Sequence, residues 1–178
     1  MEVCDEQPSL DCTLMNYYPT GNEELTLQAL YDYCQFHPTE KVIYMHNKGS
    51  FRKERGNTKI RRLSTTAVTS HACLEMPLSK AYPCNVCGLT FQSKPYFHMT
   101  ANHWVAECAY VRELVPPKVY TALRTNMLQK LWDTEPCLHH IDTNGNAISW
   151  DLKNTTFLKL FGLGRYAMER WLFGHPSL

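Results

Sequence analysis

The chain has 178 residues and a formal net charge of +1, and 44% of its residues are hydrophobic and 20% charged, as in an ordinary globular protein. This charge gives no reason to expect nucleic acid or an anionic membrane as a partner, and no run of 18 apolar residues occurs that would span a membrane. The N-terminal sequence MEVCDEQPSLDC lacks the regions of a signal peptide, so we expect a cytoplasmic location, or the secretory pathway if the chain is a fragment of a longer protein.

Residues 1–22 are polar and rich in turn residues, and we expect a single α/β domain over residues 23–178. Its first element is a helix that begins at Glu23 and ends before Pro38. The apolar residues of this helix follow a mostly helical spacing: Leu25, Leu27, Leu30, Tyr31, Cys34 and Phe36. The apolar, β-rich run VIYM at residues 42–45 then predicts a buried strand. A helix followed at once by a buried strand is typical of an α/β fold.

After the strand, a helix is expected to begin near Asn57 and to continue toward Cys73. Residues 80–103 form an irregular insertion that contains Pro, Gly, Cys and His. A short strand or helix begins at Trp104. Later elements are expected to be a helix at residues 108–114, a helix opened by Pro116 and Pro117, a hairpin turn at residues 142–146 and a final helix at residues 163–173.

Basic residues gather in one stretch of this otherwise evenly charged sequence. They are Arg52, Lys53, Arg55, Lys59, Arg61 and Arg62, with Glu54 among them. The simplest interpretation is a solvated helix face.

The residues HNKGS after the strand form a polar loop whose groups suit a diphosphate. Ligands of open α/β sheets bind just beyond the carboxyl ends of strands. Lys48 offers a positive charge and Ser50 a hydroxyl donor, and Gly49 permits close approach of the backbone. His46 and these three residues are therefore candidates for phosphate binding, and an ordinary polar loop is the alternative.

The irregular insertion holds a second candidate site, in which Cys84 and Cys87 are followed by His98 and His103. Thiolates and imidazoles suit tetrahedral zinc, and the order of the pairs resembles a two-Cys, two-His finger. Pro95 lies where the helix of such a finger would form, which disfavours a DNA-reading finger. A structural zinc ion and a Cys-rich loop with bridged or free cysteines both stay open.

The final predicted helix carries a third candidate site. Arg165 and Glu169 are four residues apart and share one helix face, so a local ion pair explains their spacing. If Glu169 points into a cleft, it is instead a candidate general base. His175, just past the helix, is a candidate metal or phosphate ligand, or a capping residue.

Three segments together resemble glycosyltransferase-like proteins of the rhamnan-synthesis type and related uncharacterised sugar-transferase domains. GNEELTLQALYDYCQFHPTEKVIYMHNKGSF is similar to that group's helix, strand and HxKG loop. NHWVAECAYVREL is similar to its GNxWxAxxxYxxxL segment, where Asn102 and Trp104 match and Ala101 stands in place of the Gly. GRYAMERWLFGHPS is similar to its closing RxxxExWxxxHP helix. The resemblance covers most of residues 20–178.

This resemblance implies an A-type glycosyltransferase fold, here as a partial sheet flanked by helices, that transfers a sugar from a nucleotide-sugar donor to a glycan or other hydroxyl acceptor. Asn102 and Trp104 would shape the sugar or acceptor site, and Glu169 would be the general base that deprotonates the acceptor hydroxyl. His175 would be a late metal or phosphate ligand. The residues expected to line the donor diphosphate are His46, Lys48, Gly49, Ser50 and Arg165.

The sequence contains no Asp-x-Asp motif, which is the usual carboxylate pair for Mg²⁺ or Mn²⁺ beside the donor. Two non-enzymatic alternatives therefore stay open beside the transferase. One is a zinc-binding module built on Cys84, Cys87, His98 and His103. The other is a degenerate sugar-binding domain that no longer catalyses.

Overall fold

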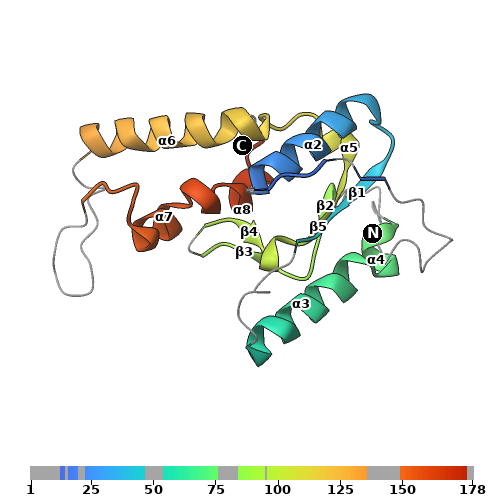
Figure 1. Cartoon of the computed structure of the whole chain (residues 1–178). Coiled ribbons are helices and arrows are strands. Elements are labelled where there is room, and N and C mark those ends of the chain that lie inside the picture. Colours follow the sequence, from blue (N-terminus) through green and yellow to red (C-terminus); the bar gives the residue numbers. More distant parts are fainter. Residues whose placement is uncertain are drawn as a thin grey trace.

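The computed structural model describes residues 13–14, 16–19, 23–46, 54–75, 84–94, 96–135 and 149–175. Within these residues, helices pack around small antiparallel sheets (Figure 1). The coarse prediction of a chain that mixes helices and strands in one fold is confirmed. Among the described residues, the strands pair in antiparallel fashion. The predicted hairpin turn at residues 142–146 lies outside the described residues.

The main sheet consists of β1 (Lys41–Tyr44), β5 (Trp104–Glu107) and β2 (Val86–Cys87), with β5 in the centre. β1 was predicted to be a buried strand, and this is wrong in part: it lies at the edge of the sheet, and only its last residue is buried. The central position belongs to β5, whose residues 104–106 are at most 1% exposed. A second, two-stranded sheet joins β3 (Phe91–Gln92) to β4 (His98–Met99).

Successive residues of β5 face opposite sides of the sheet, and each side carries its own helices. Trp104 belongs to the main core, which includes residues of α2 (Glu23–Phe36), α5 (Cys108–Val111) and α8 (Met168–Trp171). Val105 packs instead with Val68 and Cys73, on the side of α3 (Arg55–Val68) and α4 (His71–Leu74). Figure 1 shows α2 and α3 on opposite sides of the sheet. The sheet is therefore the middle layer, and β5 connects two cores.

The first predicted helix has the expected bounds. Its start is favoured by Glu23 and Glu24, which lie in the first turn, where the helix dipole favours negative charge. The helix expected near Asn57 is instead two helices. α3 ends at Val68, with Thr69 as its C-cap, and the Ser70 side chain accepts a hydrogen bond from the Cys73 backbone N–H to cap α4. Two disulfides fasten these layers: Cys34–Cys108 joins α2 to α5, and Cys73–Cys87 joins α4 to β2.

The helix α6 (Pro117–Thr134) begins with Pro at its first position, as predicted, and packs beside α2. The final segment departs from the single helix that was predicted. It forms α7 (Thr155–Phe161), the 3₁₀ turn η3 (Gly164–Tyr166) and the short α8. Gly162, with a φ angle of 60°, is the left-handed C-cap of α7, which lies before the predicted range of residues 163–173. Gly164, with a φ angle of 53°, begins η3 and keeps the predicted helix from starting at residue 163. Within the described ranges, every helix is too short or too polar to span a bilayer.

Candidate functional site

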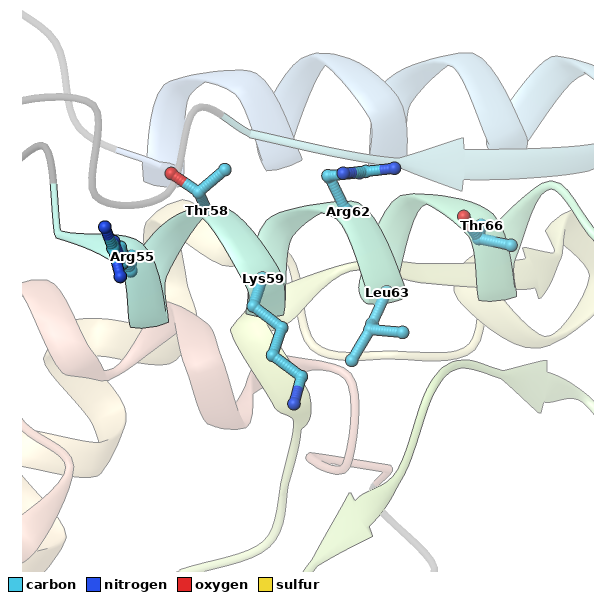
Figure 2. A pocket seen from close by; sticks show the side chains of 6 residues that line it. All are labelled: Arg55, Thr58, Lys59, Arg62, Leu63 and Thr66. Carbon is cyan, nitrogen blue, oxygen red and sulfur yellow. The ribbon is translucent and has the colours of Figure 1, made fainter.

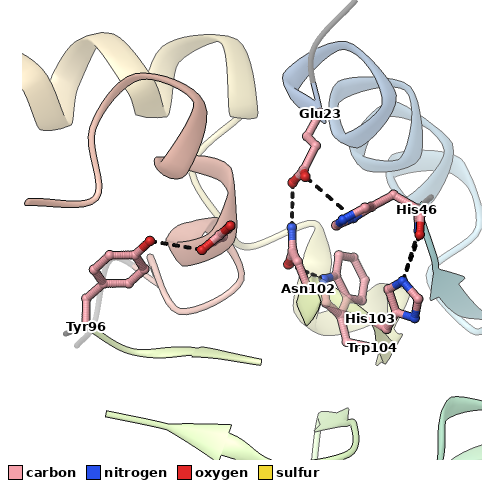
Figure 3. Close-up of polar contacts among 7 residues, drawn as sticks. Glu23, His46, Tyr96, Asn102, His103 and Trp104 are labelled. Atoms are coloured by element: carbon pink, nitrogen blue, oxygen red, sulfur yellow. Dashed lines mark hydrogen bonds and ion pairs between the residues drawn. The ribbon is translucent and has the colours of Figure 1, made fainter. Parts of the chain in front are cut away.

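A buried polar network joins the start of α2, the end of β1 and the turn before β5 (Figure 3). The Asn102 side-chain amide donates a hydrogen bond to Glu23 Oε2 at 2.7 Å and accepts one from the Trp104 indole N–H at 3.2 Å. The other oxygen of Glu23 lies 3.5 Å from His46 Nδ1. A single carboxylate on the first turn of α2 thus holds together residues that are more than 50 positions apart in the sequence.

The turn that presents Asn102 has an unusual backbone. Ala101 and Asn102 lie in the 3₁₀ turn η1 (Thr100–Asn102), and both have positive φ angles, of 61° and 51°. Asn tolerates this left-handed conformation because its side chain can make local hydrogen bonds, whereas Ala has no such compensation. The Asn102 side chain is 2% exposed and bonded on both sides, so the turn places its amide in a fixed position.

His103 continues the network on the other side of the turn. Its Nε2 lies 2.9 Å from the His46 carbonyl oxygen and 3.4 Å from the His46 backbone nitrogen. Nδ1 of the same ring is buried and has no hydrogen-bond partner among the described residues. His103 therefore fixes the backbone of His46 at the point where β1 ends.

Glu169 lies at the start of α8, where the buried Tyr96 hydroxyl donates a hydrogen bond to Glu169 Oε2 at 2.9 Å (Figure 3). Burial, and then the charge of Glu169, raise the pKa of Tyr96 above its ordinary value, so its phenol stays protonated and remains a donor. The Arg170 guanidinium lies 5.0 Å from the centroid of the Tyr96 ring.

Glu169 and Asn102 line the same cavity, which has a volume of about 190 Å³. Both the α3 side and the small β3–β4 sheet contribute to its wall. The other lining residues are Asn57, Ile60, Gln92, His98, Met99, Thr100 and Ala101. The cavity therefore combines a carboxylate with amide and hydroxyl groups, which can accept and donate hydrogen bonds to a polyhydroxylated molecule.

Comparison with known proteins places the chain in a family without an assigned activity. The model of the family described as a domain of unknown function (DUF8361) matches residues 1–178. The chain belongs to this family. No curated protein and no solved structure matches it.

In this DUF8361 domain, several of the residues singled out from the sequence lie together. Asn102, Trp104 and His46 share the network of Glu23, and Glu169 shares the cavity of Asn102. The loop residues Lys48, Gly49 and Ser50 lie outside the described residues, and so does the side chain of Arg165.

His175 lies elsewhere, at the far end of α5. Its Nε2 is 3.2 Å from Glu113 Oε2, and its ring stacks on Tyr110 with the centroids 5.7 Å apart. The Tyr110 hydroxyl in turn donates to the Leu172 carbonyl at 2.7 Å. Packing against the end of the chain's last helix is thus the role that the structure gives this histidine.

The four residues of the expected zinc site do not converge. Cys87 is bonded to Cys73, and Cys84 is an exposed free thiol. His98 Nδ1 is 2.8 Å from the Tyr96 carbonyl, and His103 is engaged by His46. Among the described residues, no three His, Cys, Asp or Glu side chains are grouped so that they could hold a metal ion. Of the two cysteines of this insertion, Cys87 is therefore bridged and Cys84 is free.

Two members of the site were not found from the sequence. Glu23 was assigned to the helix start, where the dipole alone explains an acidic residue. Tyr96 lies in the irregular insertion, and no spacing pattern connects it to Glu169, 73 positions later. For the contact between Trp104 and Asn102, the available signal was the Trp104 indole N–H, because a buried Trp requires an acceptor nearby.

Proposed function

We propose that this DUF8361 domain is a glycosyltransferase-like protein that transfers a sugar from a nucleotide-sugar donor to a hydroxyl group of a glycan. The proposal rests on the positions of the three segments that resemble glycosyltransferase-like proteins, because residues from all three lie close together. His46 from the first segment and Asn102 and Trp104 from the second meet at Glu23, and Glu169 from the third lines the cavity of Asn102.

The backbone of the second segment also supports the resemblance. The GNxW pattern has Gly where this chain has Ala101, and Ala101 has a φ angle of 61°. A left-handed residue before Asn102 is the conformation for which Gly is the usual choice. The local geometry thus explains why the pattern contains Gly at a position where this chain departs from it.

In the proposed reaction, Glu169 accepts the proton of the acceptor hydroxyl as that oxygen attacks the anomeric carbon. The hydrogen bond from Tyr96 fixes the orientation of the carboxylate. Asn102, Thr100 and Gln92 offer hydrogen bonds to sugar hydroxyls in the cavity. A volume of about 190 Å³ suits one sugar unit, so the nucleotide would extend out of the cavity toward the loop after His46.

The leaving diphosphate needs positive charge, which we assign to Lys48, with Ser50 as a hydroxyl donor. Mg²⁺ or Mn²⁺ bound together with the donor would supply the same neutralisation. Among the described residues, no group of three His, Cys, Asp or Glu side chains is placed to hold such an ion.

The test combines donor binding with transfer. Calorimetry against a panel of nucleotide sugars should identify a donor that binds, and a transfer assay should then use that donor. Glu169→Gln should lower the transfer rate by about 10²-fold or more, the usual contribution of a general base, while donor affinity changes less than about threefold. Lys48→Ala should mainly weaken donor binding.

Glu135→Gln is the matched control, because Glu135 is exposed at the end of α6 and its removal should leave both readouts unchanged. Binding of no donor, or normal transfer by Glu169→Gln, would contradict the proposal. A donor that binds to the wild-type protein without turnover would support the alternative of a sugar-binding domain that does not catalyse.

A further inference from the structure

His98 lines the cavity of Glu169, although the reaction proposed above gives it no role. Among the described residues that line this cavity, His98 and Glu169 are the two with a basic or acidic side chain. The zinc site expected from the sequence does not account for His98 either, because its expected partner Cys87 is bonded to Cys73. An imidazole in the wall of a cavity that also holds a carboxylate is a candidate for contact with a substrate.

Tyr96 positions both of these groups. Its hydroxyl donates a hydrogen bond to Glu169 Oε2 at 2.9 Å, and its backbone carbonyl oxygen lies 2.8 Å from His98 Nδ1. The rings of Tyr96 and His98 also lie against each other, with their centroids 5.2 Å apart. Tyr96 is itself buried, and the Arg170 guanidinium contacts its ring. One buried residue therefore sets the orientation of both groups in the free protein.

The contact with the Tyr96 carbonyl determines the tautomer of His98. A carbonyl oxygen only accepts hydrogen bonds, so Nδ1 is the donor and carries the proton. In the neutral imidazole, Nε2 then has a lone pair and acts as an acceptor. No hydrogen bond joins Nε2 to another described residue, and Nε2 is not among the unpaired side-chain atoms sealed in the interior. Nε2 is therefore an accessible acceptor on a residue of the cavity wall.

The β3–β4 sheet places His98 beside a second polar residue of this wall. His98 pairs with Gln92 across the two strands, and both residues line the cavity. The Gln92 side-chain amide donates a hydrogen bond to Thr100 Oγ1 at 2.8 Å, so one of its N–H groups is already engaged, while its carbonyl oxygen remains an acceptor. This part of the wall therefore suits a molecule that brings hydrogen-bond donors, such as the hydroxyl groups of a sugar.

We propose that His98 is a substrate-binding residue, whose Nε2 accepts a hydrogen bond from a hydroxyl group of the transferred sugar. This inference rests on the proposed transferase function, since it assigns a further contact in the same cavity. Glu169 keeps the role of base toward the acceptor hydroxyl, and Tyr96 orients both residues. A deoxy sugar that lacks the contacted hydroxyl leaves Nε2 unpaired, so His98 also selects among sugars.

A metal ion fits Nε2 less well than a hydroxyl group. Structural and catalytic zinc sites use at least three protein ligands, and among the described residues no three His, Cys, Asp or Glu side chains are grouped to hold an ion. Mg²⁺ bound together with a nucleotide prefers oxygen ligands to an imidazole nitrogen. A metal contact is therefore treated as an outcome that the experiment has to distinguish.

The experiment is calorimetry of the full chain against UDP-glucose, UDP-galactose, GDP-mannose and dTDP-rhamnose, each with and without Mn²⁺. For the donor that binds, His98→Ala should lower affinity about threefold to tenfold, as for the loss of one neutral hydrogen bond. His98→Gln keeps an acceptor oxygen near the position of Nε2 and should recover most of this loss. The matched control His71→Ala removes the same side chain from an exposed position on α4, so affinity should change less than about twofold.

Deoxy analogues of the donor that binds identify the contacted hydroxyl. Removal of that hydroxyl should cost the wild-type protein about threefold to tenfold in affinity. The same removal should cost His98→Ala less than about twofold, because this variant has already lost the contact. Analogues that lack any other hydroxyl should weaken binding equally in the two proteins.

Equal affinity of His98→Ala and the wild type for a donor that binds would overturn this proposal and leave the transferase standing. So would a His98→Gln variant as weak as His98→Ala, or deoxy analogues that all affect both proteins alike. A loss that occurs only with Mn²⁺ would instead make His98 a metal ligand. Nitrogen-15 NMR of the free protein tests the tautomer, and a proton on His98 Nε2 would contradict it. Binding of no donor would remove the proposed transferase and this contact together.

Discussion

At the scale of single residues, Ala101 is the position where the chain departs most clearly from the conformation its residue type prefers. Its φ angle of 61° places the Cβ atom close to the backbone, at a cost of about 1–2 kcal/mol. We expect Ala101→Gly to raise the free energy of unfolding by about 1 kcal/mol, because Gly removes this strain and gives back part of the gain through its greater unfolded-state entropy.

Urea unfolding of the two proteins measures this difference, and Ala109→Gly is the control. Ala109 is exposed within the helix α5, so the same substitution there should lower stability by up to about 1 kcal/mol. Changes of the same sign at both positions would show that Ala101 is not strained.

How much of the site was predictable differs from residue to residue. Asn102, Trp104 and Glu169 stood out because they lie in short patterns that the resemblance covers. Glu23 did not, because an acidic residue in the first turn of a helix already has a local explanation. Its second role depends on Asn102, which is 79 positions away, and no local pattern carries that information.

At the scale of elements, the helices α2 and α6 were predictable because apolar spacing and a Pro at the start are local signals. β1 was predicted to be buried because it is apolar, yet the central, buried strand is β5, and the difference lies in pairing between distant segments. The final helix was predicted over residues 163–173, although Gly162 lies directly before that range and Gly164 within it. A Gly in a helical pattern is a signal that the helix is interrupted, and both residues have positive φ angles in the structure.

Disulfides are the second element-scale feature that spacing alone did not determine, since the cysteines of each bond are far apart in the sequence. Cys34–Cys108 closes a loop of 74 residues and Cys73–Cys87 one of 14. A longer loop loses more unfolded-state entropy when it is closed, which gives about 4 kcal/mol for the first bond and about 3 kcal/mol for the second. We expect the double variant Cys34→Ala/Cys108→Ala to be less stable than the double variant Cys73→Ala/Cys87→Ala.

Urea denaturation of both double variants under non-reducing conditions tests this order. Cys84→Ala serves as the control, because the exposed free thiol of Cys84 should contribute almost nothing. If reductant leaves the wild-type midpoint unchanged, the two bonds do not constrain the chain and the prediction fails.

At the scale of the whole molecule, a net charge of +1 conceals an uneven distribution. The basic residues of α3 were interpreted from the sequence as a solvated face, and Arg55, Lys59 and Arg62 are exposed, whereas Arg61 is half-buried (Figure 2). The three exposed residues lie on the side of α3 opposite the buried Ser64, so the helix turns its positive charge outward.

Stability at alkaline pH is also a property of the whole core, because it depends on tyrosines buried in separate places. Burial, and then the charge of Glu23, raise the pKa of Tyr44, and burial raises the pKa of Tyr96 and of Tyr110. In the unfolded chain each phenol ionises near the ordinary tyrosine pKa of 10.0, whereas in the folded protein it stays neutral to higher pH. The stabilisation is therefore fully present below pH 10 and is lost as the pH rises above 10 through each folded-state pKa.

We expect the free energy of unfolding to fall above pH 10 by up to about 1.4 kcal/mol per pH unit for each such tyrosine. Tyr44→Phe keeps the shape of the ring, which is 3% exposed, and should remove one tyrosine's share of this slope between pH 10 and 11. Urea unfolding at pH 9, 10 and 11 measures the slope, in a Cys84→Ala background so that thiolate exchange with the disulfides does not intervene. An unchanged slope in Tyr44→Phe would contradict the prediction, because it would mean that the Tyr44 phenol ionises alike in the folded and unfolded chain despite its burial against Trp104.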